Sequence, residues 1–205
     1  MAMHNTPTTF YGQQTGERIL FVVKPHPIAV NIRMLVLYLI SIGILIVFYT
    51  FGKLVGPIQG TLFIIGLVIS AFISLVGTYI LKNSQGRNLT YITDRRIVRF
   101  EPSTLFATNI RTLSWDEVVK VKSYVPNMIW KQLKIGNVSV HARSTTSVLT
   151  EADPVLSVDD IEIKDVYYYR DLANFIDKIL FTYKQKPKEM DSIRPFIVKP
   201  KGERY

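Results

Sequence analysis

Five cations in the sequence could bind an anionic surface. Three arginines surround a short turn in YITDRRIVRFE, residues 91–101. Two lysines alternate with apolar residues in VVKVKS, residues 118–123, so they would lie on one face of a strand. Guanidinium and ammonium groups bind phosphates and carboxylates. The sequence therefore predicts a site for anionic lipid or a protein partner, with solvated surface charge as the alternative, at Arg95, Arg96, Arg99, Lys120 and Lys122.

Enzyme chemistry lacks the residues that it needs. The three histidines, His4, His26 and His141, show no metal-ligand spacing and no pairing with a serine. The chain has no cysteine, which excludes disulfides, thiol nucleophiles and cysteine-bound metals. Its glycines form no phosphate-binding motif. We therefore expect a protein without enzymatic activity, metal or cofactor.

Two apolar runs dominate the first half of the chain. Residues 34–51 and 54–81 contain no charged residue, and a membrane span needs roughly 20 apolar residues. A glycine-rich turn joins them, so we predict a two-helix transmembrane hairpin over residues 28–81, with spans at about 30–51 and 59–81. Buried core helices are the alternative, but the rest of the chain is too short to cover two helices that are apolar on every face.

Lysine and arginine flank the two runs unequally, and the positive-inside rule gives the topology. Seven cations lie outside the runs and one lies between them: Arg18, Lys24, Arg33, Lys82, Arg87, Arg95 and Arg96, against Lys53. We predict a multi-pass protein of the inner (cytoplasmic) membrane, with both termini and the following domain in the cytoplasm. The arginine turn follows the second span closely, so it would lie near anionic headgroups. Membrane confinement excludes nucleic acid as a partner, despite a net charge of +9.

The remaining sequence predicts an α+β domain with flexible ends. Residues 1–27 indicate a flexible N-terminus with a possible strand at Ile19–Val23, residues 82–184 a domain, and residues 185–205 a flexible, basic, proline-containing tail. Alternating apolar residues predict strands at Leu89–Thr93, Arg96–Phe100, Ile110–Ser114, Val118–Tyr124, Gly136–His141, Ser147–Leu149 and Ile161–Ile163. Asn127–Leu133 indicates a short helix or wide loop, and a helix capped by Asp165 would run to about Tyr183 and cover the sheet.

Five short motifs together resemble the bacterial PH-like domain proteins of the membrane-anchored YdbS type. They are GERIL at 16–20, YITDRRIV at 91–98, WDEVVKVKSY at 115–124, KIGNVSV at 134–140 and DVYYYRDLANFI at 165–176. The resemblance implies a PH-like, partly open antiparallel β-barrel of about seven strands, capped by the C-terminal helix. It implies little about activity, because a fold does not determine a function.

The leading hypothesis is a non-enzymatic membrane-anchored adaptor or scaffold that binds a protein partner, with a homo-oligomer as a further possibility. An exposed strand edge of the domain would accept an extended peptide. The alternative is an accessory subunit of a membrane transport or export complex that packs through its helices. Small residues that share one helix face would make those contacts, unless the two spans use them to pack on each other: Gly66, Ser70, Ser74 and Gly77.

Overall fold

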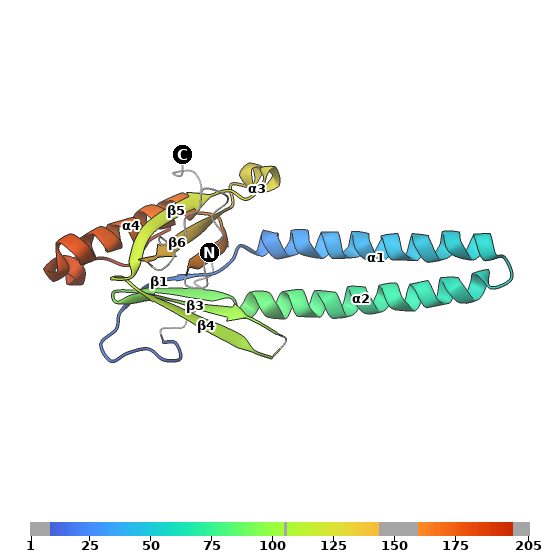
Figure 1. Cartoon of the computed structure of the whole chain (residues 1–205), viewed down its shortest axis with the longest axis horizontal. Helices are drawn as coiled ribbons and strands as arrows, with labels where there is room; N and C mark the ends of the chain where they lie inside the picture. The colour runs from blue at the N-terminus through green and yellow to red at the C-terminus, as the bar shows by residue number, and fades with distance from the viewer. Residues whose placement is uncertain (1–8, 105, 144–159, 199–205) are drawn as a thin grey trace. The chain divides into compact units, whose positions relative to one another are not determined.

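A computed structural model describes residues 9–104, 106–143 and 160–198. The chain divides into two compact units (Figure 1). One unit holds residues 27–87 and 104–107, and the other holds the strands and the remaining helices.

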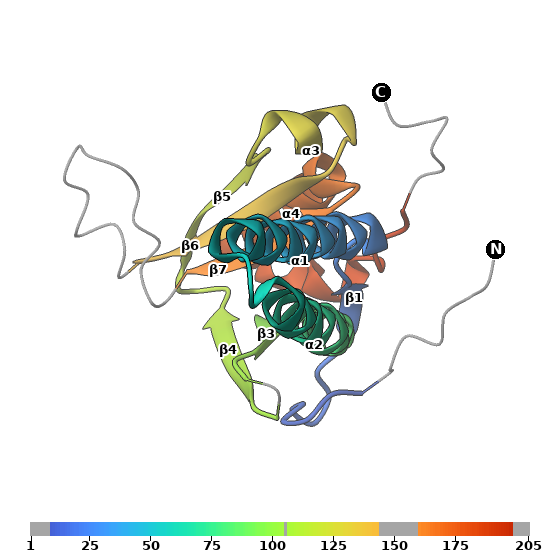
Figure 2. The same ribbon diagram turned by 90° about the vertical axis from the view of Figure 1, so that its right-hand side faces the viewer.

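The first unit is a pair of long apolar helices, α1 (Pro27–Val55) and α2 (Gln59–Arg87), which lie side by side (Figure 2). Each has 29 residues, which corresponds to roughly 43 Å at 1.5 Å per residue. The turn between them contains Gly56 at φ +75°, a conformation that favours glycine. Both helices extend beyond the predicted spans, because polar residues such as those of NSQGR continue α2 past its apolar run.

The surface of the two helices distinguishes them from the core helices of a soluble protein. Only 6% of the most apolar window of each helix is buried, whereas a core helix would be mostly covered. Large side chains such as Leu54 and Leu75 are 85% and 74% exposed. Both helices are thus long and apolar enough to cross a membrane, and the described part of the chain leaves most of their surface uncovered.

The second unit contains two antiparallel sheets. The first sheet has the strand order β1 (Ile19–Val23), β2 (Leu89–Thr93), β3 (Arg96–Pro102) and β4 (Thr108–Ser114). The second has the order β5 (Val118–Tyr124), β6 (Gly136–Ala142) and β7 (Ile161–Val166). The helical segments are α3 (Met128–Gln132), α4 (Tyr169–Gln185) and the 3₁₀ helix η2 (Pro187–Ser192). No described strand of one sheet pairs with a strand of the other, so the sheets do not close into a single barrel.

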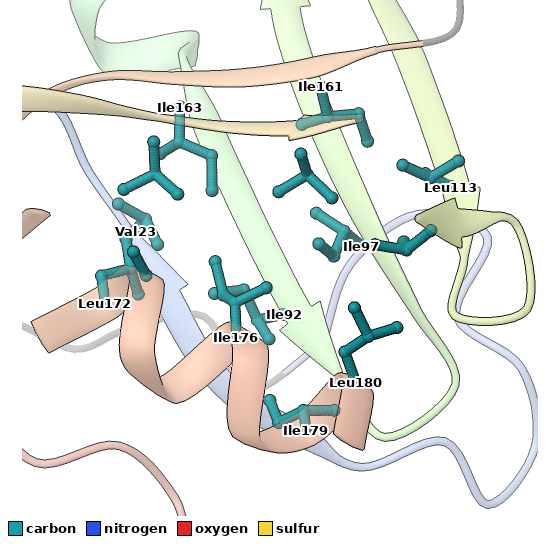
Figure 3. Packing of buried hydrophobic residues seen from close by; sticks show 14 of the residues in the cluster. Val23, Ile92, Ile97, Leu113, Ile161, Ile163, Leu172, Ile176, Ile179 and Leu180 are labelled. Atoms are coloured by element: carbon teal, nitrogen blue, oxygen red, sulfur yellow. The ribbon is translucent and has the colours of Figure 1, made fainter. Parts of the chain in front are cut away.

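One hydrophobic core joins both sheets to the amphipathic helix α4 (Figure 3). Leu172 and Ile176 of α4 are fully buried together with Ile92 of β2 and Ile161 of β7. The buried Trp115 lies between β4 and β5, and its indole N–H donates to the Thr93 carbonyl at 3.1 Å. The alternation of apolar residues that predicted the strands therefore also identifies the side chains that α4 covers.

Most predicted strands are present, and the short helix α3 lies within the segment 127–133. Six of the seven strands predicted after the spans appear, two of them with the predicted bounds, and Ser147–Leu149 lies outside the described residues. Asp165 does not cap α4, so that prediction was wrong. It lies in β7 at φ 59°, where its carboxylate accepts the Trp130 indole N–H at 2.7 Å and fixes α3.

Both regions predicted to be flexible contain packed residues where the structure describes them. Phe10 stacks on Tyr91 with a ring separation of 4.8 Å, and Glu17 is buried. At the other end of the chain, η2 follows α4, and Ile193 is buried against the core. Composition alone did not reveal these contacts, because the apolar side chains involved are separated by polar and charged residues in both segments.

Strand β1 makes the helical hairpin an insertion within the domain. It precedes α1 in the chain, yet it pairs with β2, which follows α2, in a register that aligns Val23 with Thr90. Three residues connect β1 to α1, and Asn88 alone connects α2 to β2. The domain therefore requires sequence from both sides of the hairpin.

A chain that begins at residue 82 is expected not to fold, because it lacks Leu20, Val22 and Val23, all buried on β1. Loss of each large buried side chain costs roughly 2–5 kcal/mol, against a total stability of about 5–15 kcal/mol. Replacing residues 27–87 by a short Gly-Ser linker keeps β1, so this control is expected to fold. Circular dichroism and urea titration compare the two chains, and a cooperatively folded 82–205 fragment would contradict the expectation.

Candidate functional site

The β2–β3 turn binds the N-terminal segment of the chain. The Thr93 hydroxyl accepts the backbone N–H of Arg96 at 3.0 Å and lies 2.8 Å from the Glu17 carboxylate. Asp94 accepts the Arg18 backbone N–H at 3.0 Å and pairs with its guanidinium at 3.3 Å. The polar residues of the TDRR turn thus hold residues 17 and 18 beside it.

Arg96 forms a two-point ion pair with Glu17. Its Nε and Nη2 lie 2.9 and 3.0 Å from the two carboxylate oxygens, and Nη2 also donates to the Gly12 carbonyl at 2.7 Å. Burial by itself would raise the pKa of Glu17, but hydrogen bonds from Arg96, the Gln14 N–H and Thr93 outweigh it and lower that pKa. The same carboxylate raises the pKa of Arg96. Arg96 is therefore engaged within the chain rather than free for a ligand.

Arg99 is buried, which contradicts its predicted place in an exposed patch. It is 4% exposed because it follows Ile97 by two residues and so lies on the inward face of β3. Its Nη2 pairs with Glu101 at 3.0 Å, and Glu101 also pairs with Arg111 at 3.4 Å. Burial lowers the pKa of Arg99, while the nearby carboxylates oppose that shift.

The structure does not bring the five predicted cations together. Arg95 is exposed at the β2–β3 turn of the four-stranded sheet, where it donates to the Gln14 side chain at 3.1 Å. Lys120 and Lys122 are exposed on β5, the edge strand of the other sheet. The predicted patch is thus reduced to one arginine on one sheet and two lysines on the other.

A polar face on the three-stranded sheet escaped the sequence prediction, apart from its two lysines. Glu162 on β7 is 8% exposed; it accepts hydrogen bonds from Tyr124, from Asn137 at 3.0 Å and from Lys164 at 3.1 Å. Burial would raise the pKa of Glu162, but these partners lower it. The sequence does carry a signal for this face, because polar residues stand at every second position of β5, of β6 and of the stretch that leads from Asp160 into β7: Lys120, Lys122, Tyr124, Asn137, Ser139, His141, Asp160, Glu162 and Lys164.

His141 lies between a serine and an aspartate on this polar face. Its Nδ1 is 3.0 Å from Asp160 and its Nε2 is 3.3 Å from the Ser139 hydroxyl, a pairing with a serine that the sequence reasoning did not find. Carboxylate, imidazole and hydroxyl in this order can activate a serine nucleophile. Ser139, however, is 2% exposed, so its hydroxyl is closed to solvent. The contacts cross-link β6 to the start of β7 and give this face a structural role.

The small residues of α2 face α1. A Cβ atom at Gly66 would lie 2.5 Å from Phe48, and one at Gly77 would lie 2.7 Å from Leu37. Ser70 donates to the Ser41 carbonyl at 2.7 Å, and Ser74 is half-buried. The predicted packing face is therefore used between the two helices of the hairpin.

No family model, curated protein or solved structure matches this chain. The resemblance to membrane-anchored PH-like proteins accordingly stays a hypothesis. Within the part of the chain that the structure describes, no cluster of three or more histidine, aspartate or glutamate side chains could hold a metal ion.

Replacing Glu17 by Gln is expected to destabilise the domain by about 2–3 kcal/mol at pH 7, because it leaves a largely buried guanidinium without its carboxylate. The pKa of Glu17 is lowered in the folded state, so its contribution is complete above the ordinary value of 4.5 and is lost as the pH falls below it. The difference between the Glu17→Gln variant and the unmodified protein should therefore shrink towards pH 3. Both tryptophans, Trp115 and Trp130, lie in the domain, so their fluorescence during urea unfolding of the full chain in micelles measures this difference.

Glu189→Gln is the matched control. Glu189 forms an ion pair with Lys186 in which both side chains are 56% exposed, so its loss should have little effect. Equal destabilisation by the two variants, or a Glu17 effect that is unchanged at pH 3, would contradict a buried ion pair as the source.

Proposed function

We propose that this chain is a non-enzymatic membrane-anchored adaptor, which holds a PH-like domain at the cytoplasmic face of the inner membrane and binds a protein partner. The observation that carries the proposal is the insertion of an uncovered apolar hairpin between two paired strands, β1 and β2. Two connections of three residues and one residue join the domain to the hairpin. A bilayer around the helices would therefore confine the domain to the membrane surface.

Exposed strand edges favour protein binding by this domain. β4 and β5 are the last strands of their sheets, and no described strand pairs with their outer edges. Ile110 of β4 and Val119 of β5 are 46% and 41% exposed. Strand edges without a neighbouring strand, beside exposed apolar side chains, allow an extended segment of a partner to add to a sheet.

Anionic lipid remains a secondary part of the proposal and rests on fewer residues. Arg95, Lys120 and Lys122 keep exposed side chains, whereas Arg96 and Arg99 are engaged internally. Lysines on an edge strand also have a simpler role, because charge on an edge discourages uncontrolled pairing between sheets. The two lysines therefore support electrostatic selection of a partner at β5 as much as contact with headgroups.

The alternative, an accessory subunit that packs through its helices, loses its expected contact face. Gly66, Ser70 and Gly77 pack against α1 within the hairpin. Any helix-mediated assembly, including a homo-oligomer, would have to use the large outward side chains instead.

The membrane topology predicts opposite labelling of two engineered cysteines. The chain has no native cysteine, so Pro57→Cys in the turn between the helices and Ser192→Cys in η2 give clean single sites. An impermeant maleimide added to intact bacterial cells should label residue 57, and label residue 192 only after the membrane is opened. Labelling of residue 192 in intact cells would reverse the proposed orientation.

Photocrosslinking distinguishes the adaptor from the accessory subunit. A photoreactive amino acid at Ile110 or Val119 should give adducts with a partner, and the same group at Leu75, which is 74% exposed on α2, should give none. Adducts from residue 75 alone would instead support assembly through the helices. Mass spectrometry of the purified adducts identifies the crosslinked segment of the partner.

A further inference from the structure

The chain's own C-terminal segment, residues 190–196 (MDSIRPF), lies along the outer edge of β1. The inner edge of β1 pairs with β2, so the outer edge ends the four-stranded sheet. The Phe196 backbone N–H donates to the Leu20 carbonyl of β1 at 3.1 Å. The segment thus makes a main-chain contact at a strand edge, as a bound peptide does in strand addition.

Arg18 holds the start of the segment mainly through its backbone. Its guanidinium donates to the carbonyls of Met190 and Asp191 at 3.0 and 3.1 Å and pairs with the Asp191 carboxylate at 3.1 Å. Asp94, at the β2–β3 turn, accepts from Arg18 Nε at 3.3 Å and orients the side chain. Two of the three contacts that Arg18 makes with the segment therefore require only a backbone, whatever the side chains.

Three side chains of the segment make apolar contacts, and Met190 is half-buried against the core. Ile193 is 8% exposed and joins the domain core. The Phe196 ring lies 4.8 Å from Phe21, 5.0 Å from Phe175 and 5.7 Å from Tyr168, measured between ring centres. Arg194 and Pro195, between the two, are exposed. Ile193 is the most deeply buried of the three and Phe196 makes the aromatic contacts, so an aliphatic residue and an aromatic residue three positions later are the main anchors.

We propose that this β1-edge site, formed by Arg18, Leu20, Phe21, Tyr168 and Phe175, is a peptide-binding site that the C-terminal segment occupies until a partner displaces it. The inference rests on the proposed adaptor function and names the partner's chemistry. The partner supplies a segment with an aspartate or glutamate at the end of a helical turn, an aliphatic residue two positions later and an aromatic residue three positions after that, as in the chain's own segment after η2. This spacing reproduces Asp191, Ile193 and Phe196.

The contacts at the start of the segment suit exchange with a competitor. The Asp191 side chain is 94% exposed and that of Arg18 is 43% exposed, so water readily replaces their ion pair. The segment is tethered in cis, which gives it a high effective concentration and lowers the apparent affinity of any competitor. Displacement is therefore expected only for a partner that is itself concentrated at the membrane.

The test uses the full-length protein in nanodiscs and a fluorescent peptide that copies residues 188–198 (KEMDSIRPFIV) as the probe. Fluorescence anisotropy compares the unmodified protein with Phe196→Ala and with the double variant Ile193→Ser, Phe196→Ala, which release the site to different degrees. We expect the peptide to bind the released variants roughly tenfold or more tightly than the unmodified protein. Peptides with both anchor residues changed to Ala should not bind, while the matched Arg194→Ala peptide should bind normally, because Arg194 is exposed.

Hydrogen exchange of the β6 and β7 amides checks that each variant is folded. If the double variant is not folded, the Phe196→Ala variant replaces it in the test, because this substitution removes only a half-buried ring. Absence of peptide binding to a folded released variant would overturn the β1-edge site. The site would also be overturned if the peptide with Ala at both anchor positions bound the released variants as tightly as the unchanged peptide does. Peptide binding does not involve a natural partner, so it can succeed even if the photocrosslinking at β4 and β5 gives no adduct, and the two proposals fail separately.

Discussion

The pairing of β1 with β2 is the constraint on which the rest of the structure depends. These strands are neighbours in one sheet but are separated in the chain by the entire helical hairpin. The core around Leu20, Val23 and Ile92 therefore forms only when the two ends of the hairpin come together. Closing a loop of that length is unfavourable for a flexible chain, but two helices packed through Gly66 and Gly77 return the chain to its starting point. Folding of the helices and folding of the domain thus favour each other.

The cations near the hairpin illustrate how a charged motif can serve the fold. Arg96 and Arg18 bind Glu17 and Asp94, which holds the segment before β1 against the β2–β3 turn. A basic turn that follows a membrane span is consistent with both lipid binding and topology, and the sequence does not distinguish these from an internal ion pair. Only the partner residue Glu17, more than seventy positions earlier in the chain, explains why Arg96 is needed.

Local patterns in the sequence predicted much of the fold, whereas contacts between residues far apart in the chain could not be predicted from it. Uncharged runs and alternation predicted the two helices and the strands, with identical bounds for Leu89–Thr93 and Val118–Tyr124. The burial of Arg99 was accessible in principle, because it shares a strand face with the apolar Ile97. The contact of His141 with Asp160 was not, since it depends on the register between β6 and β7 across a long connection.

The strand edges of the domain are protected in different ways, and the difference bears on function. On β5, Lys120 and Lys122 discourage pairing by their charge, and on β1 the chain's own segment covers the edge. A charged edge selects among partners by their charge, whereas a covered edge would be uncovered by a competitor of matching spacing. Confinement to a membrane increases the local concentration of any partner that shares it, so modest affinity suffices for exchange. Both devices would thus combine protection with selective binding, the β5 edge through charge and the β1 edge through exchange of its segment.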